Sequence, residues 1–123
     1  MEKIFFIIGA VSAAISVALG AFGAHGLRER LTPQLLEIFE TGVRYEIYHA
    51  FAILFVAFAL TRWQSNLIPL AGWAFVLGTL IFSGSLYLLA LTDTRWLGAI
   101  TPLGGVAFIA GWILLVVGVW QSK

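Results

Sequence analysis

Four long apolar segments with few charges constrain the fold of this chain more than any other feature. They cover residues 4–24, 45–61, 70–91 and 101–120. A helix rises about 1.5 Å per residue, so roughly 20 apolar residues cross the hydrocarbon core of a bilayer. The segments take up most of the 123 residues, of which 61% are hydrophobic and 11% charged. We therefore predict a single-domain, all-α integral membrane protein with four transmembrane helices.

The second apolar segment is preceded by an amphipathic stretch, residues 33–44. Thr32-Pro33 is typical of a helix start, with threonine as the N-cap and proline at the first helical position. At helical spacing, its apolar and polar residues fall on two different faces. The apolar face contains Leu36, Phe39, Val43 and Ile47, and the polar face contains Glu37, Glu40, Thr41 and Arg44. We expect an interfacial helix that leads into the second span, with Gly42 as a possible bend. Thr101-Pro102 predicts the start of the fourth span in the same way.

Composition excludes several classes of function. The net charge is +1 and the basic residues are scattered, so the chain lacks the basic patch of a nucleic-acid-binding protein. It has no cysteine, which excludes disulfides, thiolate metal ligands and thiol nucleophiles. The sequence does not contain the residues of a Ser-His-Asp catalytic triad in a known order, a phosphate-binding loop or a metal-ligand signature. The sequence therefore predicts no cofactor, no metal and no enzyme activity.

Small residues recur at helical spacing on the first and last spans. Such residues let membrane helices approach closely, where lipid supplies no hydrophobic drive for association. We predict helix contacts along both stripes, which comprise Ser12, Ser16, Gly20 and Ala24, and Gly104, Gly111 and Gly118. Glycine and alanine are also common in membrane helices without forming such contacts.

Polar residues gather toward one membrane face. Strict alternation of four spans brings the ends of the first and third and the starts of the second and fourth to the same surface. The candidate site there consists of His25, Tyr45, Glu46, His49, Ser83, Ser85, Tyr87 and Pro102. Ionisable residues at membrane depth suggest function, but the same groups can simply hydrogen-bond between helices. Glu46 and Asp93 are equally consistent with carboxylates at the protein surface, next to Arg44 and Arg95 respectively.

Two histidines in this region allow one further hypothesis. Imidazoles from adjacent helices can bind haem or a transition metal, and His25 and His49 both lie toward the polar face. Glu46 or Asp93 could supply a third ligand. The sequence spacing between these acidic residues and the histidines is not a recognised metal-ligand signature in either case.

Four sequence segments resemble a family of small membrane proteins, domain of unknown function 423, whose eukaryotic relatives are called transmembrane protein 256. The segments are Gly20 to His25, Thr41 to His49, Phe82 to Tyr87, and Thr101 to Trp112. The resemblance covers essentially the whole chain. It implies a multi-pass protein of the bacterial plasma membrane, with no established activity and both termini cytoplasmic. The family usually has glutamine where this chain has Glu46, and fixes no arginine at position 44.

Three functional hypotheses remain open at this point. The first is a non-enzymatic bundle that organises the membrane or binds a partner, either another membrane protein or a second copy of the chain. The second is a small transporter or channel subunit that uses the polar cluster, which requires a water-accessible cavity at His49. The third is the haem or metal protein that uses His25 and His49.

Overall fold

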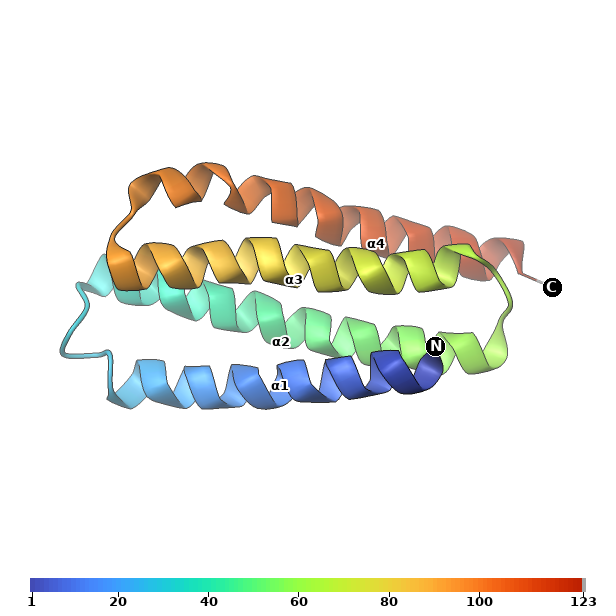
Figure 1. The fold of residues 1–123 in the computed structure, drawn as a ribbon, viewed down its shortest axis with the longest axis horizontal. Coiled ribbons are helices and arrows are strands. Elements are labelled where there is room, and N and C mark those ends of the chain that lie inside the picture. The colour runs from blue at the N-terminus through green and yellow to red at the C-terminus, as the bar shows by residue number, and fades with distance from the viewer. Residues whose placement is uncertain (123) are drawn as a thin grey trace.

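A computed structural model describes residues 1–122 and shows four α-helices in that range (Figure 1). They are α1 (Glu2–His25), α2 (Pro33–Arg62), α3 (Leu67–Thr92) and α4 (Thr101–Gln121), with a short 3-10 helix, η1 (Arg95–Ala99), before α4. Each α-helix is long and apolar enough to cross a membrane, the last together with η1. The predicted all-α architecture with four candidate spans is confirmed.

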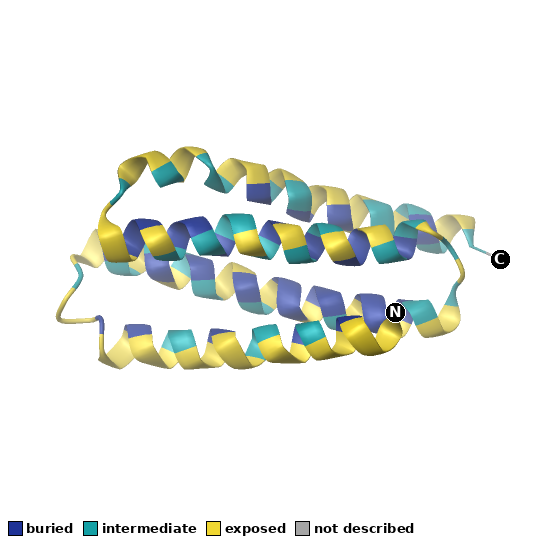
Figure 2. Cartoon of the chain, viewed as in Figure 1, coloured by how far each residue is buried: buried dark blue, intermediate teal, exposed yellow. Residues whose placement is uncertain are grey.

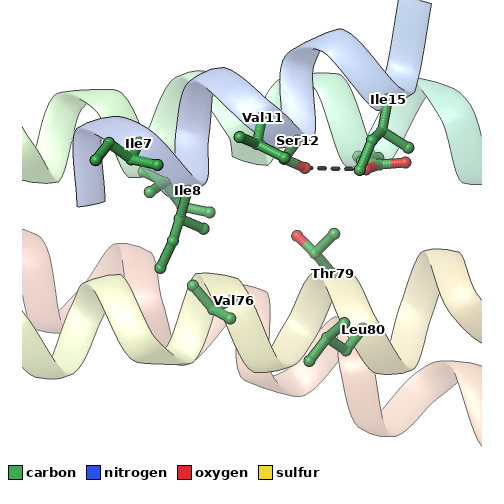
Figure 3. A pocket seen from close by; sticks show the side chains of 10 residues that line it. Ile7, Ile8, Val11, Ser12, Ile15, Val76, Thr79 and Leu80 are labelled. Carbon is green, nitrogen blue, oxygen red and sulfur yellow. Dashed lines mark hydrogen bonds between the residues drawn. The ribbon is translucent and has the colours of Figure 1, made fainter. Parts of the chain in front are cut away.

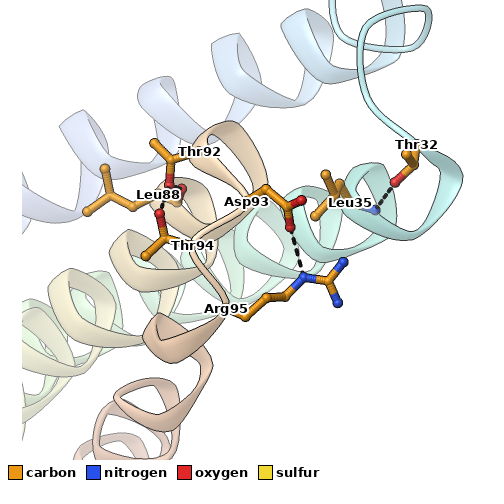
Figure 4. Close-up of polar contacts among 7 residues, drawn as sticks. All are labelled: Thr32, Leu35, Leu88, Thr92, Asp93, Thr94 and Arg95. Carbon is orange, nitrogen blue, oxygen red and sulfur yellow. Dashed lines mark hydrogen bonds and ion pairs between the residues drawn. The ribbon is translucent and has the colours of Figure 1, made fainter.

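The loops at one end of the bundle show how the helices begin and end (Figure 4). The Leu35 amide donates to the Thr32 hydroxyl at 3.2 Å, as expected for the predicted cap of α2. Asp93 ends α3 in the left-handed conformation, with φ of 52°, and accepts a 2.8 Å hydrogen bond from Arg95. The predicted cap at Thr101 is wrong. Ile100 is the N-cap, and the Thr101 hydroxyl contacts Ser85 of α3 instead.

The amphipathic stretch and the second span form one continuous helix. α2 has 30 residues and is therefore about 45 Å long, more than the roughly 30 Å of the hydrocarbon core. Its charged residues near the start, Glu37, Glu40 and Arg44, are exposed. Its buried face differs from the predicted apolar face and includes Leu35, Phe39, Gly42, Glu46 and His49. Glu46 and His49, two polar residues of α2, therefore point into the bundle.

The helices pack in the order of the chain, α1 on α2, α2 on α3 and α3 on α4 (Figure 1). The ends of α1 and α3 and the starts of α2 and α4 lie at the same end of the bundle, as predicted from an even number of crossings. Burial is concentrated on α2 and α3, whereas α1 and α4 are largely exposed (Figure 2). The main apolar core joins all four helices through residues such as Phe5, Ile53, Phe75 and Phe108.

Buried small residues on the two outer helices repeat every seventh position. On α4 they are Gly104, Gly111 and Gly118, which face α3. A Cβ atom on Gly111 would lie only 2.6 Å from the Phe75 ring. On α1 the buried small residues are Gly9, Ser16 and Gly23.

The predicted stripe on α1 follows this buried face only in part. Ser16 is buried, Ser12 and Gly20 are half-buried, and Ala24 is exposed. A four-residue repeat drifts by about 40° per step around an α-helix, whereas a seven-residue repeat drifts by about 20° over two turns. Residues spaced by four therefore leave the contact face, which explains the exposure of Ala24.

Candidate polar site inside the bundle

The Glu46 carboxyl joins three helices near the middle of the bundle. Its Oε1 accepts a 2.6 Å hydrogen bond from the Tyr87 hydroxyl of α3, and its Oε2 accepts a 2.9 Å bond from the Ser12 hydroxyl of α1. Glu46 is only 5% exposed. Ser12 lies about 15 Å from the start of α1 and about 20 Å from its end, so the group is far from both bundle ends.

Gly42 provides the space that the Tyr87 ring needs. It lies four residues before Glu46 on the same face of α2, and a Cβ atom there would be 2.7 Å from Tyr87 Cε1. The carbonyl of Gly42 also accepts a buried 2.7 Å hydrogen bond from the Ser83 hydroxyl. The sequence suggested a bend at Gly42. The structure gives it a different role, because the missing side chain lets Tyr87 reach the carboxyl.

Glu46 is held by neutral donors rather than by a cation. The ion pairs found within residues 1–122 are Met1 with Glu2 and Arg95 with Asp93, and both lie at the exposed surface. Asp93 is thus the surface charge that was predicted. The same interpretation of Glu46, beside Arg44, is wrong, because Glu46 faces the inside of the bundle and Arg44 is exposed. A carboxyl at this depth is costly unless its oxygens are hydrogen-bonded.

His49 forms a second polar contact, between α2 and α4. Its Nδ1 lies 2.8 Å from the Tyr45 carbonyl, and its Nε2 accepts a 3.1 Å hydrogen bond from the Trp112 indole. These partners require the neutral ring with the proton on Nδ1. The Phe108 ring stacks on the imidazole with a centroid distance of 3.5 Å. His49 is therefore covered by aromatic side chains and has both ring nitrogens in use.

The two serines of α3 that were predicted as site residues make separate contacts. Ser83 bonds to Gly42 as described, and Ser85 shares a 2.6 Å hydrogen bond with Thr101 at the start of α4. These hydroxyls connect α3 to the helices on either side of it. They do not contact the Glu46 carboxyl.

The remaining predicted site residues lie outside this buried network. His25 and Pro102 are exposed at the end of the bundle, and the Tyr45 side chain is 39% exposed. Gly23 packs against Phe39, which lies ten residues before His49, and His25 lies two residues beyond Gly23, so the two histidines are roughly 18 Å apart along the bundle. A shared haem or metal site for His25 and His49 does not fit this arrangement. Among residues 1–122, no group of three or more potential metal ligands is found.

A cavity of about 300 Å³ lies beside Glu46, between α1 and α3 (Figure 3). We call it the α1–α3 groove. It is lined by Ile7, Ile8, Val11, Ser12, Ile15, Glu46, Ile53, Val76, Thr79 and Leu80. Its rim residues Ile7, Val11, Ile15 and Leu80 are exposed on the outer surface of the bundle, so in a membrane the groove faces lipid.

Thr79 contributes a polar group that the sequence analysis missed. Its hydroxyl is buried and, in the part of the chain that the structure describes, has no hydrogen-bond partner. Figure 3 shows this hydroxyl directed across the groove toward α1. A threonine in a membrane helix usually bonds to its own helix backbone, so no sequence signal marks a free hydroxyl at this position.

Comparisons with known proteins show full-length similarity to bacterial membrane proteins. The chain is 48% identical over 116 residues to "UPF0382 membrane protein YwdK" of Bacillus subtilis (strain 168), covering 94% of each chain. It is 42% identical over 122 residues to "UPF0382 inner membrane protein YgdD" of Escherichia coli (strain K12), covering 99% of this chain and 93% of the relative. It is therefore a membrane protein. No solved structure matches.

The family comparison gives the same result. The family model described as "Protein of unknown function (DUF423)" matches residues 19–105. That range includes the Glu46, His49 and Thr79 positions, together with all of α3. By this match and by its close relatives, the chain belongs to the DUF423 family of proteins of unknown function.

Proposed function

We propose that the protein is a non-enzymatic membrane protein that binds another component of the bilayer in the α1–α3 groove. The observation that carries this proposal is the position of Glu46. Its carboxyl lines a groove whose rim is exposed to lipid, rather than a pore or a water-filled cleft. A binding partner would reach it from within the plane of the membrane.

The other polar contacts support a structural role for the rest of the cluster. The hydroxyls of Ser83 and Ser85 and the ring of His49 bond between helices, as polar residues in membrane bundles commonly do. A transporter that used His49 would need water to reach the imidazole. Phe108 and Trp112 cover it, which favours the binding protein over the transporter.

Affinity purification in native nanodiscs would test the proposal. We expect a reproducible membrane component, whether a lipid, another membrane protein or a second copy of the chain, and an envelope phenotype on deletion. Leu80→Trp would fill the groove and should abolish co-purification. Leu77→Trp is the matched control, because Leu77 is exposed on α3 but does not line the groove. Failure to recover any component, or equal recovery with both variants, would contradict the proposal.

Membrane location and orientation are part of the same proposal. We assign the protein to the bacterial cytoplasmic membrane, with both termini in the cytoplasm. An inner-membrane relative supports the location, and the family resemblance described above implies the orientation. The chain has no native cysteine, so single cysteines report orientation directly. His25→Cys should react with an impermeant maleimide in spheroplasts, and Ser122→Cys only after lysis. The reverse pattern would refute the orientation.

A further inference from the structure

We propose that the α1–α3 groove binds a lipophilic ammonium, an organic monocation whose N–H groups donate to Glu46 and Thr79 while its apolar body lies against α1 and α3. The inference rests on the proposed function and names the chemical class of the bound component.

The carboxyl of Glu46 is the first reason for a cationic ligand. A carboxylate can accept about four hydrogen bonds, and Ser12 and Tyr87 supply two. Glu46 also lines the groove, so the acceptor sites that these donors leave free are the ones a ligand there would use. Both protein donors are neutral, so a ligand that brings a positive charge would complete the pairing of this carboxylate.

The charged residues around the groove determine which sign of charge a ligand should carry. Its lining contains one acidic residue and no Lys, Arg or His from α1, α2 or α3. Tyr87, whose hydroxyl donates to Glu46, is the titratable group that reaches the carboxyl from a neighbouring helix. His49 of α2 is directed to α4 instead. An anionic ligand would be repelled here, and a neutral one would leave the carboxylate without a counter-charge.

The hydroxyl of Thr79 is the second polar group that calls for a ligand. It is buried without a partner in residues 1–122 and belongs to the groove lining. A buried hydroxyl without a hydrogen bond is unfavourable, and an ammonium carries several donors. Thr79 and Glu46 line the same groove, so a ligand bound there would meet both groups.

The walls and size of the groove define the rest of the ligand. Seven of its ten lining residues are isoleucine, valine or leucine, so the body of the ligand should be apolar. The volume of about 300 Å³ is at the lower limit of ligand pockets, which run from about 300 to 1,000 Å³. Because the rim is exposed to lipid, a longer alkyl chain would extend into the bilayer rather than clash with the protein.

Binding of octylammonium to the purified full chain in nanodiscs tests the inference. Equilibrium dialysis of radiolabelled octylamine at pH 7 would measure saturable binding above that of empty nanodiscs. Octanol, which has the same chain length and no charge, is the matched neutral probe. Glu46→Gln should weaken octylammonium binding at least about thirtyfold, because it removes the charge partner. Glu40→Gln, an exposed carboxylate on the same helix, should have no effect.

Thr79→Val keeps the test informative if Glu46→Gln fails to fold. The Thr79 hydroxyl has no partner in the described residues, so its removal should leave the fold intact. We expect about a fivefold loss of octylammonium affinity from one lost hydrogen bond. Absence of saturable binding, equal binding of octanol, or unchanged binding in both variants would overturn the inference.

The outcomes also separate this inference from the proposed function. If octylammonium does not bind while a membrane component still co-purifies in a groove-dependent way, only the ligand class is wrong. If octylammonium binds at Glu46 but no component co-purifies and deletion has no phenotype, the proposed function fails while the ligand class stands.

Discussion

Glu46 and His49 lie three residues apart on α2 and are both 5% exposed, yet their surroundings differ. His49 faces α4, whose Trp112 and Phe108 occupy its Nε2 and its ring face, while its Nδ1 bonds to the Tyr45 carbonyl of α2 itself. Glu46 faces α1 and α3 and borders the α1–α3 groove. Burial alone therefore does not distinguish a structural polar group from one that is available to a ligand.

The difference follows from helix geometry. Residues three apart on an α-helix are separated by about 60° around its axis, which is enough to face different neighbours when a helix contacts several others. On the α4 side of α2, aromatic rings cover the imidazole. On the side between α1 and α3, aliphatic side chains leave a cavity. The following substitutions test the two sides separately.

The largest effect on stability should come from Gly42→Leu, which disrupts the helix packing around Glu46. The new side chain would collide with the Tyr87 ring, 2.7 Å from the Cβ position, and displace the ring from the carboxyl. We expect a loss of about 3 kcal/mol in the free energy of unfolding, from overpacking. Thermal unfolding in detergent, followed by circular dichroism, would measure it. Gly84→Leu is the control, since nothing lies within 4 Å of its Cβ position. Equal losses in both variants would argue against the packing described here.

Tyr87→Phe should have the next largest effect. It removes the 2.6 Å hydrogen bond to Glu46 and leaves the ring in place. Loss of a bond to a charged partner costs about 2 kcal/mol of stability, measured by the same unfolding assay. Tyr48→Phe is the matched control, because Tyr48 is 52% exposed. A Tyr87→Phe variant as stable as the Tyr48→Phe protein would show that the carboxyl does not depend on this donor.

Trp112→Phe tests the His49 side and should have a smaller effect. The variant keeps an aromatic ring but loses the indole N–H that donates to His49 Nε2 at 3.1 Å. We expect about 1 kcal/mol of destabilisation, as for other hydrogen bonds between membrane helices. Trp120→Phe, at a position that is 86% exposed, should be neutral. If octylammonium binding also changed in Trp112→Phe, the two sides would not be independent.

Thr79→Val should have the smallest effect on stability, within about 0.5 kcal/mol of the parent, because its hydroxyl bonds to nothing in the described chain. Ser83→Ala is the comparison, since its buried hydroxyl donates to the Gly42 carbonyl at 2.7 Å. We expect that variant to lose about 1 kcal/mol. Both are measured by thermal unfolding in detergent. A Thr79→Val protein that is less stable than Ser83→Ala would mean that the threonine hydroxyl is hydrogen-bonded in the folded protein.

The sequence predicts the four helices and their even number of crossings because these depend on local length and hydropathy. The buried face of α2 was harder to predict. Leu36, Val43 and Ile47 suggested an apolar face, but the helix turns Gly42 and Glu46 inward. That choice depends on α1 supplying Ser12 and α3 supplying Tyr87, which are 34 and 41 residues from Glu46 in the sequence.

The candidate site could be predicted only in part for the same reason. Glu46, Tyr87, Ser83 and His49 were recognised as polar residues at membrane depth, but their partners were not. Trp112 resembled a residue of the apolar span, and Thr79 resembled an ordinary helical threonine. The groove has no sequence signature, because it arises from the separation of α1 and α3 on the surface of α2.

The packing of the helices in chain order has a consequence for biogenesis. Each helix after the first packs against the helix synthesised immediately before it. A chain that enters the membrane from its N-terminus can thus pair each new helix on arrival, without reopening contacts already made. Contacts between nearby segments also favour rapid assembly. The Glu46 carboxyl follows the same order, since it can accept from Ser12 once α1 and α2 have paired and from Tyr87 when α3 arrives.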